Sequence, residues 1–289
     1  MPLTSDPIRD HATVIFLHVG KTAGATMRRA LRREFGASEV MELKAPTVAP
    51  GRLRRDGAVA YFGALPESER ARARLIMGHM NYGLHEVVPR PSTYVTLLRD
   101  PIKLILSQYH HVRRHEGHLL HEEAKAYPDL ISYVRSGLSL EMDNSQTRAF
   151  AGDDTTPFGG CTPAMLERAK GHLDRSFAVV GLTERFDESL VLMQQAFAWD
   201  RIRYVSVNID PGRDRRDAPS EEELAVIREQ NALDLELYAW AQDRFAATLR
   251  DTPGFDASLA RFLKDNERYQ PWGRLTQLPR RVAERATNR

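Results

Sequence analysis

The chain has 289 residues, of which 42% are hydrophobic and 28% are charged, a composition typical of a folded globular protein. Its formal net charge is only +2, which does not indicate a nucleic-acid-binding protein. No apolar run approaches the roughly 20 residues of a membrane-spanning helix, and the polar start MPLTSDPIRDH is unlike a secretory signal. The single cysteine, Cys161, cannot form an internal disulfide, which fits a reducing compartment. From these features together we expect a cytoplasmic protein without a transmembrane segment.

Short apolar runs alternate with helical patterns along the first two thirds of the chain. Strands are expected at residues 13–19, 74–78, 93–98, 177–182 and 203–207. Helices are expected at residues 25–35, 101–114, 130–135, 142–151, 163–173 and 185–199. Only helical patterns follow, and Ser220 is a suitable N-cap for the segment PSEEELAVIREQ.

This alternation predicts the fold class. We expect an α/β, P-loop-like fold with a central, mostly parallel sheet, helices on both faces and a helical C-terminal region. Neither a repeat nor a long linker divides the chain. A single domain is therefore predicted over residues 1–289, with its core at about 13–250 and a basic C-terminal tail at 270–289.

The stretch HVGKTAGATM lies between the first expected strand and the first expected helix. Backbone N–H groups in such a turn point into the space before the helix, where the helix dipole favours an anion. Gly20 and Gly24 allow close approach of the backbone, and Lys21 adds a positive charge. A Walker loop for ATP or GTP needs a further glycine where this chain has Ile15. The alternative is a plain turn with a surface lysine.

The stretch TLLRDPIKLILSQY follows another expected strand. Asp100 and Pro101 suit the cap and first position of the next helix. Arg99 would lie at the carboxyl end of the strand, where ligands bind in open α/β sheets. Together with Ser107 it could hold one phosphate group, because a guanidinium matches phosphate oxygens. An ordinary salt bridge of Arg99 is the alternative.

These two stretches resemble the cofactor motifs of sulfotransferases that use 3′-phosphoadenosine 5′-phosphosulfate (PAPS). The carbohydrate branch, with the heparan sulfate 2-O- and 6-O-sulfotransferases, is the most similar. The resemblance continues in the same order through GHMNYGL, DNSQTRAFAG, VVGLTERFDESL and NALDLELYAWAQDRF. It implies an enzyme that moves the sulfuryl group from PAPS to a hydroxyl acceptor, expected to be a glycan, and releases PAP without a metal ion.

The resemblance also implies roles for individual residues. The 5′-phosphosulfate would be held by Lys21, Thr22, Ala23, Gly24, Ala25 and Thr26, and the 3′-phosphate by Arg99 and Ser107. Lys21 would also stabilise the leaving group, and His79 of MGHMNYGL would be the general base, with His85 in reserve. Ala25 stands where many members have Ser or Thr, and the membrane anchor of the Golgi members is not expected here.

Further residues are expected near the reactants. The acceptor would be bound by Tyr82, Asn144, Gln146 and Arg148. Arg213 and Arg216 could close over the 3′-phosphate, and a solvated charged loop is the alternative. The histidine-rich segment HHVRRHEGHLLHEE lacks the HExxH spacing, so we do not expect it to bind a metal.

Two other functions stay open at this point. A P-loop kinase for a small molecule or sugar would bind Mg-ATP, but no strand ending in an aspartate for the metal is apparent. A non-catalytic nucleotide-binding module would keep the fold without turnover. We expect no nucleic-acid partner, and the sequence does not indicate an oligomeric state.

Overall fold

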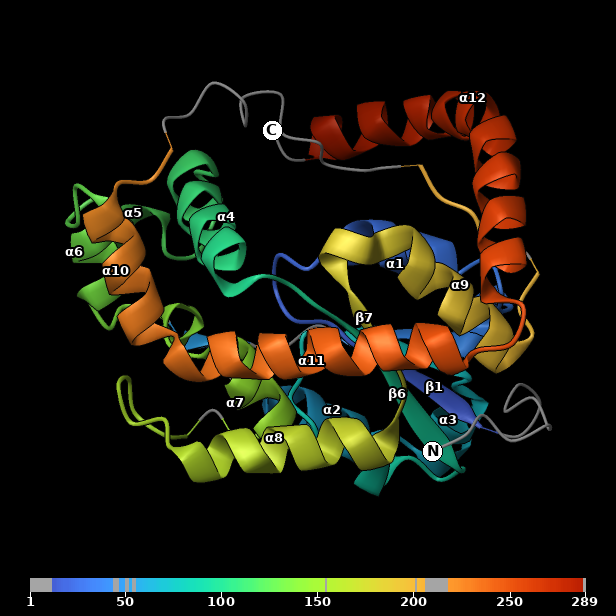
Figure 1. Ribbon diagram of the computed structural model, residues 1–289, viewed down its shortest axis with the longest axis horizontal. Helices are drawn as coiled ribbons and strands as arrows, with labels where there is room; N and C mark the ends of the chain where they lie inside the picture. Colours follow the sequence, from blue (N-terminus) through green and yellow to red (C-terminus); the bar gives the residue numbers. More distant parts are fainter. Residues whose placement is uncertain are drawn as a thin grey trace.

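The central sheet contains five parallel strands (Figure 1). They are β1 (Thr13–Leu17), β2 (Val40–Leu43), β5 (Leu75–Gly78), β6 (Ser92–Leu98) and β7 (Phe177–Leu182), in the order β2-β5-β1-β6-β7. A separate antiparallel pair consists of β3 (Thr47–Ala49) and β4 (Arg52–Leu53). The computed structural model describes residues 12–43, 47–49, 52–53, 56–153, 155–200, 202–205 and 218–287, with the backbone alone at 47–49, 52–53, 56 and 274–287.

The sheet forms because its strands are apolar on both faces. Every residue of β1 is buried, which is typical of a parallel strand covered by helices on both sides. The polar side chains in this core bond to neighbouring backbone. Thr13 Oγ1 donates to Ala73 O at 2.8 Å, and Thr96 Oγ1 donates to Leu17 O at 2.8 Å. These bonds allow a hydroxyl to be buried without an unpaired polar group.

Helices surround the sheet and make up the C-terminal region (Figure 1). They are α1 (Gly24–Leu31), α2 (Asp56–Ala64), α3 (Glu67–Arg72), α4 (Pro101–Arg114), α5 (His121–Ala124), α6 (Leu130–Arg135), α7 (Ser145–Ala151), α8 (Pro163–Ser176), α9 (Phe186–Phe197), α10 (Glu221–Gln230), α11 (Ala232–Asp251) and α12 (Phe255–Thr287). Short 3₁₀ turns are η2 (Ala37–Glu39), η3 (Leu84–Val87), η4 (Leu140–Met142) and η5 (Thr183–Arg185). Helix α9 packs on β7 and against α12, whereas α7, α8 and α11 pack together.

The expected fold class is confirmed, and so are the expected helix caps. Asp100 accepts from Lys103 N at 2.9 Å with Pro101 at the first position of α4, and Ser220 caps α10 by accepting from Glu223 N. The strand expected at 203–207 is wrong for its described part. Tyr204 N donates to Asn266 Oδ1 of α12 at 2.9 Å instead of joining the sheet, and residues 206–207 lie outside the described residues.

Three strands of the sheet end at the edge where the predicted site residues begin. Leu17 of β1 pairs with Gly78 of β5, and β6 lies on the other side of β1. The segments that follow these strands carry the HVGKTAG stretch, His79 and Arg99. The parallel topology therefore brings three separate sequence motifs to one edge, where open α/β sheets bind ligands.

None of the helices in the described part of the chain is long and apolar enough to cross a membrane.

Candidate active site

The turn between β1 and α1 is shaped to receive an anion. Lys21 and Ala23 have φ values of 65° and 58°, left-handed conformations that cost non-glycine residues on the order of 1–2 kcal/mol. Ala23 is the N-cap of α1 and provides no side-chain bond to the helix, and the first turn of α1 contains no acidic residue. The N-terminus of α1 is thus without a side-chain cap in the described protein, so its N–H groups suit an external anion.

The predicted members of this turn differ in exposure. Lys21, Ala23 and Ala25 are half-buried, and Thr26 is buried. Thr22 is fully buried, and its hydroxyl donates to Val19 O at 2.8 Å, so this side chain fixes the turn from within. Contact of Thr22 with a ligand is therefore expected through its backbone N–H. Binding of a phosphosulfate by these residues stays a prediction.

Gly24 is required by a buried histidine that sequence reasoning did not single out. A Cβ atom at position 24 would lie 1.7 Å from His18 Nε2, a distance that no side chain tolerates. The His18 ring is stacked on Phe16 with 5.5 Å between centroids and lies 4.2 Å from the ring of His79. His18 therefore fills the space behind the first turn of α1 and connects it with the segment after β5.

His79 lies at the carboxyl end of β5, and its side chain is exposed. His79 Nδ1 is 3.0 Å from His18 O. A carbonyl oxygen can only accept, so the neutral imidazole carries its hydrogen on Nδ1 and has its lone pair on Nε2. This tautomer is the one that a general base using Nε2 needs, and the ring contact with His18 fixes its position.

Arg99 is held at the turn by two separate contacts. Its Nη1 donates to Lys21 O at 2.7 Å. Its backbone N donates to Gln146 Oε1 and its backbone O accepts from Gln146 Nε2, both at 2.9 Å. Gln146 is fully buried, so its amide serves to align the end of β6 with the turn. Ser107 lies half-buried on α4, and the joint binding of a 3′-phosphate by Arg99 and Ser107 stays a prediction.

Asn144 takes part in a reciprocal pair of helix caps. Its Oδ1 accepts from Leu233 N at 2.9 Å and from Asp234 N at 3.0 Å, at the start of α11. In return the Asp234 carboxylate accepts from the N atoms of residues 146 and 147, at 3.0 and 2.7 Å, at the start of α7. Burial raises the pKa of the Asp234 carboxyl, and the two amide donors oppose this shift. This pairing explains why the motifs DNSQTR and NALDLE occur together.

Arg148 is also used inside the protein. Its side chain is 3% exposed and forms an ion pair with Asp143, and its Nη1 and Nη2 donate to Thr156 O and Pro157 O at 2.6 and 2.9 Å. Asn144, Gln146 and Arg148 are thus buried and hydrogen-bonded within the fold. The structure gives each of them a structural role, and their contact with an acceptor stays a prediction.

Tyr82 and the reserve base His85 lie away from the turn. Tyr82 is stacked on His172 with 3.9 Å between centroids, and its hydroxyl is 2.7 Å from Ser176 Oγ. His85 Nδ1 is 3.0 Å from the hydroxyl of Tyr94. Tyr94 is near the start of β6, four residues and therefore about 13 Å before its carboxyl end. The structure does not bring Tyr82 and His85 together with Lys21.

The histidine-rich segment lies beside the turn, which the sequence did not indicate. His111 at the end of α4 lies 4.3 Å from His115 and 5.4 Å from His118 between ring centroids. Burial and the nearby charge of Lys21 lower the pKa of His111 to about 3, and both effects also lower the pKa values of His115 and His118. These imidazoles are therefore neutral at pH 7 and within electrostatic range of Lys21. Only His111 of the three lies on α4, and its spacing of three residues from Gln108 is the signal that could have placed it.

The carboxylate of Glu141 lies close to Gly20 in the turn. Glu141 of η4 bonds to Gln108 of α4, and its Oε1 is 3.5 Å from the position that a Cβ atom of Gly20 would occupy. Glu141 also raises the pKa of His118, against the larger effect of burial. Within the part of the chain that the structure describes, no group of three or more His, Cys, Asp or Glu side chains could hold a metal ion.

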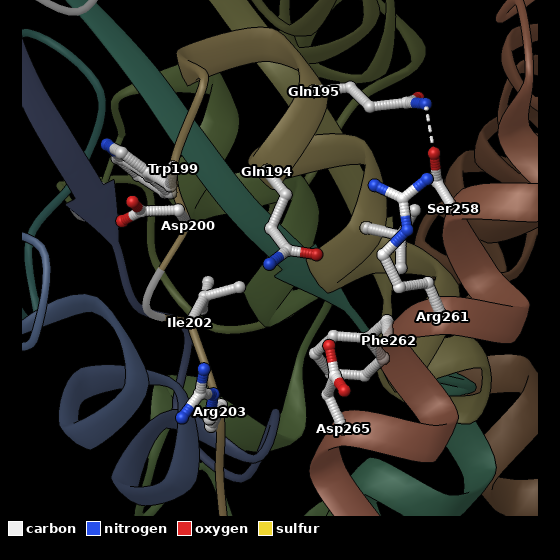
Figure 2. Close-up of a pocket in the computed structure, with 11 residues that line it drawn as sticks. Gln194, Gln195, Trp199, Asp200, Ile202, Arg203, Ser258, Arg261, Phe262 and Asp265 are labelled. Atoms are coloured by element: carbon white, nitrogen blue, oxygen red, sulfur yellow. Dashed lines mark hydrogen bonds between the residues drawn. The ribbon is translucent and has the colours of Figure 1, made fainter.

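A cavity of about 280 Å³ lies elsewhere, between the second half of α9 and the first turns of α12 (Figure 2). Its lining includes Gln194, Trp199, Arg261 and Asp265, and none of the predicted site residues. The end of α9 is about 18 Å along the helix from its start beside β7, so this cavity is separate from the turn. Arg213 and Arg216 lie outside the described residues.

Fold and turn together define the class of this protein: a P-loop-like α/β protein in which a helix N-terminus without a side-chain cap lies at the carboxyl edge of a parallel sheet. Residues 1–261 match the model of the galactose-3-O-sulfotransferase family, and the chain belongs to this family. The resemblance to carbohydrate sulfotransferases is thereby confirmed.

Individual relatives are similar at a lower level. Human galactose-3-O-sulfotransferase 3 is 28% identical over 266 residues, which cover 86% of this chain and 60% of the relative. Human galactosylceramide sulfotransferase is 28% identical, with 78% of this chain and 55% of the relative covered. Heparan-sulfate 6-O-sulfotransferase 2 of Danio rerio is 27% identical, with 82% and 59% covered. The chain thus spans no more than about 60% of the length of these relatives.

Proposed function

We propose that this chain is an enzyme that transfers the sulfuryl group of PAPS to a hydroxyl group of a carbohydrate and releases PAP. The observation that carries the proposal is the N-terminus of α1, which has no side-chain cap, lies next to Lys21, and is connected through His18 to the exposed His79. The family match and the names of the relatives, which include galactose, galactosylceramide and heparan sulfate, support a sugar acceptor.

The donor would bind across the carboxyl edge of the sheet. Residues 21–26 would hold the phosphosulfate through their backbone N–H groups and the Lys21 ammonium. Arg99 would reach the 3′-phosphate from the end of β6, where its bond to Lys21 O already ties it to the turn. The turn at residues 21–26 would thus bind the phosphosulfate end of PAPS, and Arg99 would bind its 3′-phosphate.

In the reaction, the acceptor oxygen forms a bond to sulfur while the bond from sulfur to the bridging oxygen breaks. His79 Nε2 takes the hydroxyl proton, which the Nδ1 contact with His18 O prepares it to do. The electron pair of the broken bond goes to the phosphate of PAP. Lys21 and the N–H groups of the turn stabilise the charge that develops there.

The kinase alternative is not favoured by the structure. Ile15, at the position of the Walker glycine, is fully buried in the middle of β1. The turn begins only after Leu17, and it is therefore shorter than a loop that wraps a nucleoside triphosphate.

The proposal can be tested by incubating the whole chain with ³⁵S-labelled PAPS and separate acceptors: lactose, galactosylceramide and desulfated heparan. We expect label to move to at least one sugar and PAP to accumulate in equal amount. Failure to bind PAP in calorimetry, or tight binding of Mg-ATP in its place, would contradict the proposal.

Several expectations remain predictions: the single domain, the cytoplasmic location, the roles of Arg213 and Arg216, and activity without metal or nucleic acid.

A further inference from the structure

Helix α12 packs on the rest of the protein through one stripe of positions, which ends at Gly273. The stripe follows helical spacing and consists of Phe255, Phe262, Asn266, Tyr269 and Gly273. All of them are buried except the half-buried Tyr269, which bonds to Arg33. A Cβ atom at position 273 would lie 2.4 Å from Val205 Cγ2, so α12 still lies close to its neighbours there.

Beyond Gly273 this packing stripe becomes polar. The same spacing leads to Gln277, Arg280 and Glu284. Pro271 lies in the interior of α12, and prolines bend helices. Figure 1 shows a sharp bend in α12, after which its last part runs along the upper edge of the view, away from the central sheet. The last part of α12 therefore does not continue the stripe that packs its first part on the protein.

A second, apolar stripe begins at Trp272. Among the described large hydrophobic residues Trp272 is the most exposed, at 72%. At about 100° per residue, the apolar positions of the last part of α12 fall within one sector of about 140°: Trp272, Leu275, Leu278, Pro279, Val282, Ala283 and Ala286. The charged positions fall within a separate sector of about the same width: Arg274, Arg280, Arg281, Glu284 and Arg285. This part of α12 is thus an amphipathic helix with four arginines against one glutamate.

This pattern matches the surface of an anionic membrane. A helix with arginines on its polar side and Trp, Leu and Val on the other lies in the plane of the interface, with its apolar side at the acyl boundary. Tryptophan favours that boundary because its ring is apolar and its N–H is polar. Arginines are attracted to negatively charged headgroups, which their long apolar stems allow them to reach. An uncharged apolar partner would match only one of the two sectors.

We propose that the last part of α12, residues 272–287, is a docking surface for a lipid membrane with anionic headgroups. Trp272 enters the boundary between headgroups and acyl chains, and the arginines contact the headgroups. None of these residues belongs to the candidate active site, and the docking does not depend on sulfate transfer.

Flotation of the whole chain with two kinds of vesicle tests the docking: phosphatidylcholine alone, and phosphatidylcholine mixed with an equal amount of phosphatidylserine. Wild type should bind the mixed vesicles much more strongly, and less so as the salt concentration rises. Trp272→Ala should lower the partition coefficient on the order of 10-fold, and Arg285→Gln should lower it about fivefold. The matched controls are Tyr61→Ala on α2 and Arg250→Gln on α11, both at exposed positions, and they should bind as wild type does.

Tryptophan fluorescence identifies the inserted residue. The emission of wild type should shift to shorter wavelength when mixed vesicles are added. Trp272→Phe should still bind these vesicles but should lose the shift, because Trp199 is buried and Trp240 is half-buried on α11. The thermal unfolding midpoint of each variant, measured without vesicles, separates lost docking from lost folding.

Three results would overturn the inference. One is wild type that does not float with the mixed vesicles, or floats equally with both kinds. Another is equal partition of Trp272→Ala and Tyr61→Ala at unchanged unfolding midpoints. The third is a wild-type dimer in sedimentation that Trp272→Ala dissociates, which would show that a second copy of this chain covers the apolar sector.

Discussion

Lys21 combines a strained backbone with a functional side chain. Its backbone has a left-handed φ of 65°, a conformation that glycine adopts more easily than lysine. Its carbonyl oxygen accepts a hydrogen bond from the guanidinium of Arg99. Strained conformations of this kind concentrate where a binding site needs them. The backbone of Lys21 therefore holds Arg99 at the turn, whereas its side chain is the part expected to contact the donor.

Replacement of this lysine separates its side chain from its backbone. We expect Lys21→Ala to lower kcat about 100-fold or more, as for the loss of one donor to a developing negative charge. The bond of Arg99 to the carbonyl of residue 21 should persist, so the thermal unfolding midpoint should change little. Radiolabel transfer and calorimetric unfolding measure the two effects. An unchanged kcat in the variant would show that the Lys21 side chain does not stabilise the leaving group.

His79 offers a sharper substitution than alanine. An asparagine at position 79 can still donate to His18 O, but it has no group in place of Nε2. His79→Asn should therefore lower kcat by about 10²- to 10⁴-fold while the affinity for PAP stays within about twofold of wild type. Single-turnover rates and calorimetry with PAP provide the comparison. A parallel loss of PAP affinity would show that His79 maintains the structure of the turn and does not act as the general base.

At the scale of elements, α7 and α11 are tied by their reciprocal caps. Asp234 caps α7, Asn144 caps α11, and Gln146 of α7 in turn aligns Arg99 beside the turn. Helix α11 is thus connected to the candidate site through buried hydrogen bonds. Asn144 and Gln146, two of the residues expected to bind the acceptor, form the middle of this connection.

The caps can be broken one at a time. Asp234→Asn loses the charge and one acceptor oxygen that serve the N–H groups of α7, so we expect the unfolding free energy to fall by about 1–3 kcal/mol. Asp243→Asn is the matched control on an exposed position of the same helix. Urea titration of both variants measures the difference. Equal stability of the two would mean that the cap contributes nothing measurable.

Helix α4 brings a titratable group next to the turn. Burial and Lys21 depress the pKa of His111 to about 3, below the ordinary 6.5, so the unfolded chain binds a proton at this ring that the folded protein does not. The contribution to stability is complete above pH 6.5 and is lost as the pH falls towards 3. Its slope has a limit of about 1.4 kcal/mol per pH unit for one proton, and solvent screening at this half-buried ring makes it smaller.

Chemical unfolding between pH 8 and pH 4 checks this effect. His111→Asn should lose less unfolding free energy than wild type as the pH falls below 6.5, and above pH 7 the two curves should run parallel. A wild-type curve with the same acid slope as the variant would contradict the depressed pKa of His111.

At the scale of the whole molecule, the sequence predicts those helices and strands whose residues show a clear local pattern. The run TVIFL is apolar throughout and became the buried strand β1, and Asp100 with Pro101 marked the start of α4. The edge strand β2 was not predicted, because VMEL is short and only Leu43 of its four residues is buried. The segment around Tyr204 alternates like a strand, but its amide bonds to α12.

The candidate site shows the same limit. The ordered motifs identified the turn, His79 and Arg99, because the carboxyl ends of parallel strands meet at one edge. The burial of Asn144 and Gln146 depends on partners 47 to 90 residues away, which no local pattern reveals. The placement of His111 beside Lys21 likewise follows from how α4 packs on the turn.

The central claim is that the turn before α1 holds the sulfate donor, and a crystal structure of the whole chain with PAP tests it most directly. The account predicts the 5′-phosphate of PAP at the N–H groups of residues 21–26, with the 3′-phosphate within hydrogen-bond distance of Arg99. PAP bound elsewhere, or a triphosphate with magnesium in this turn, would contradict the account.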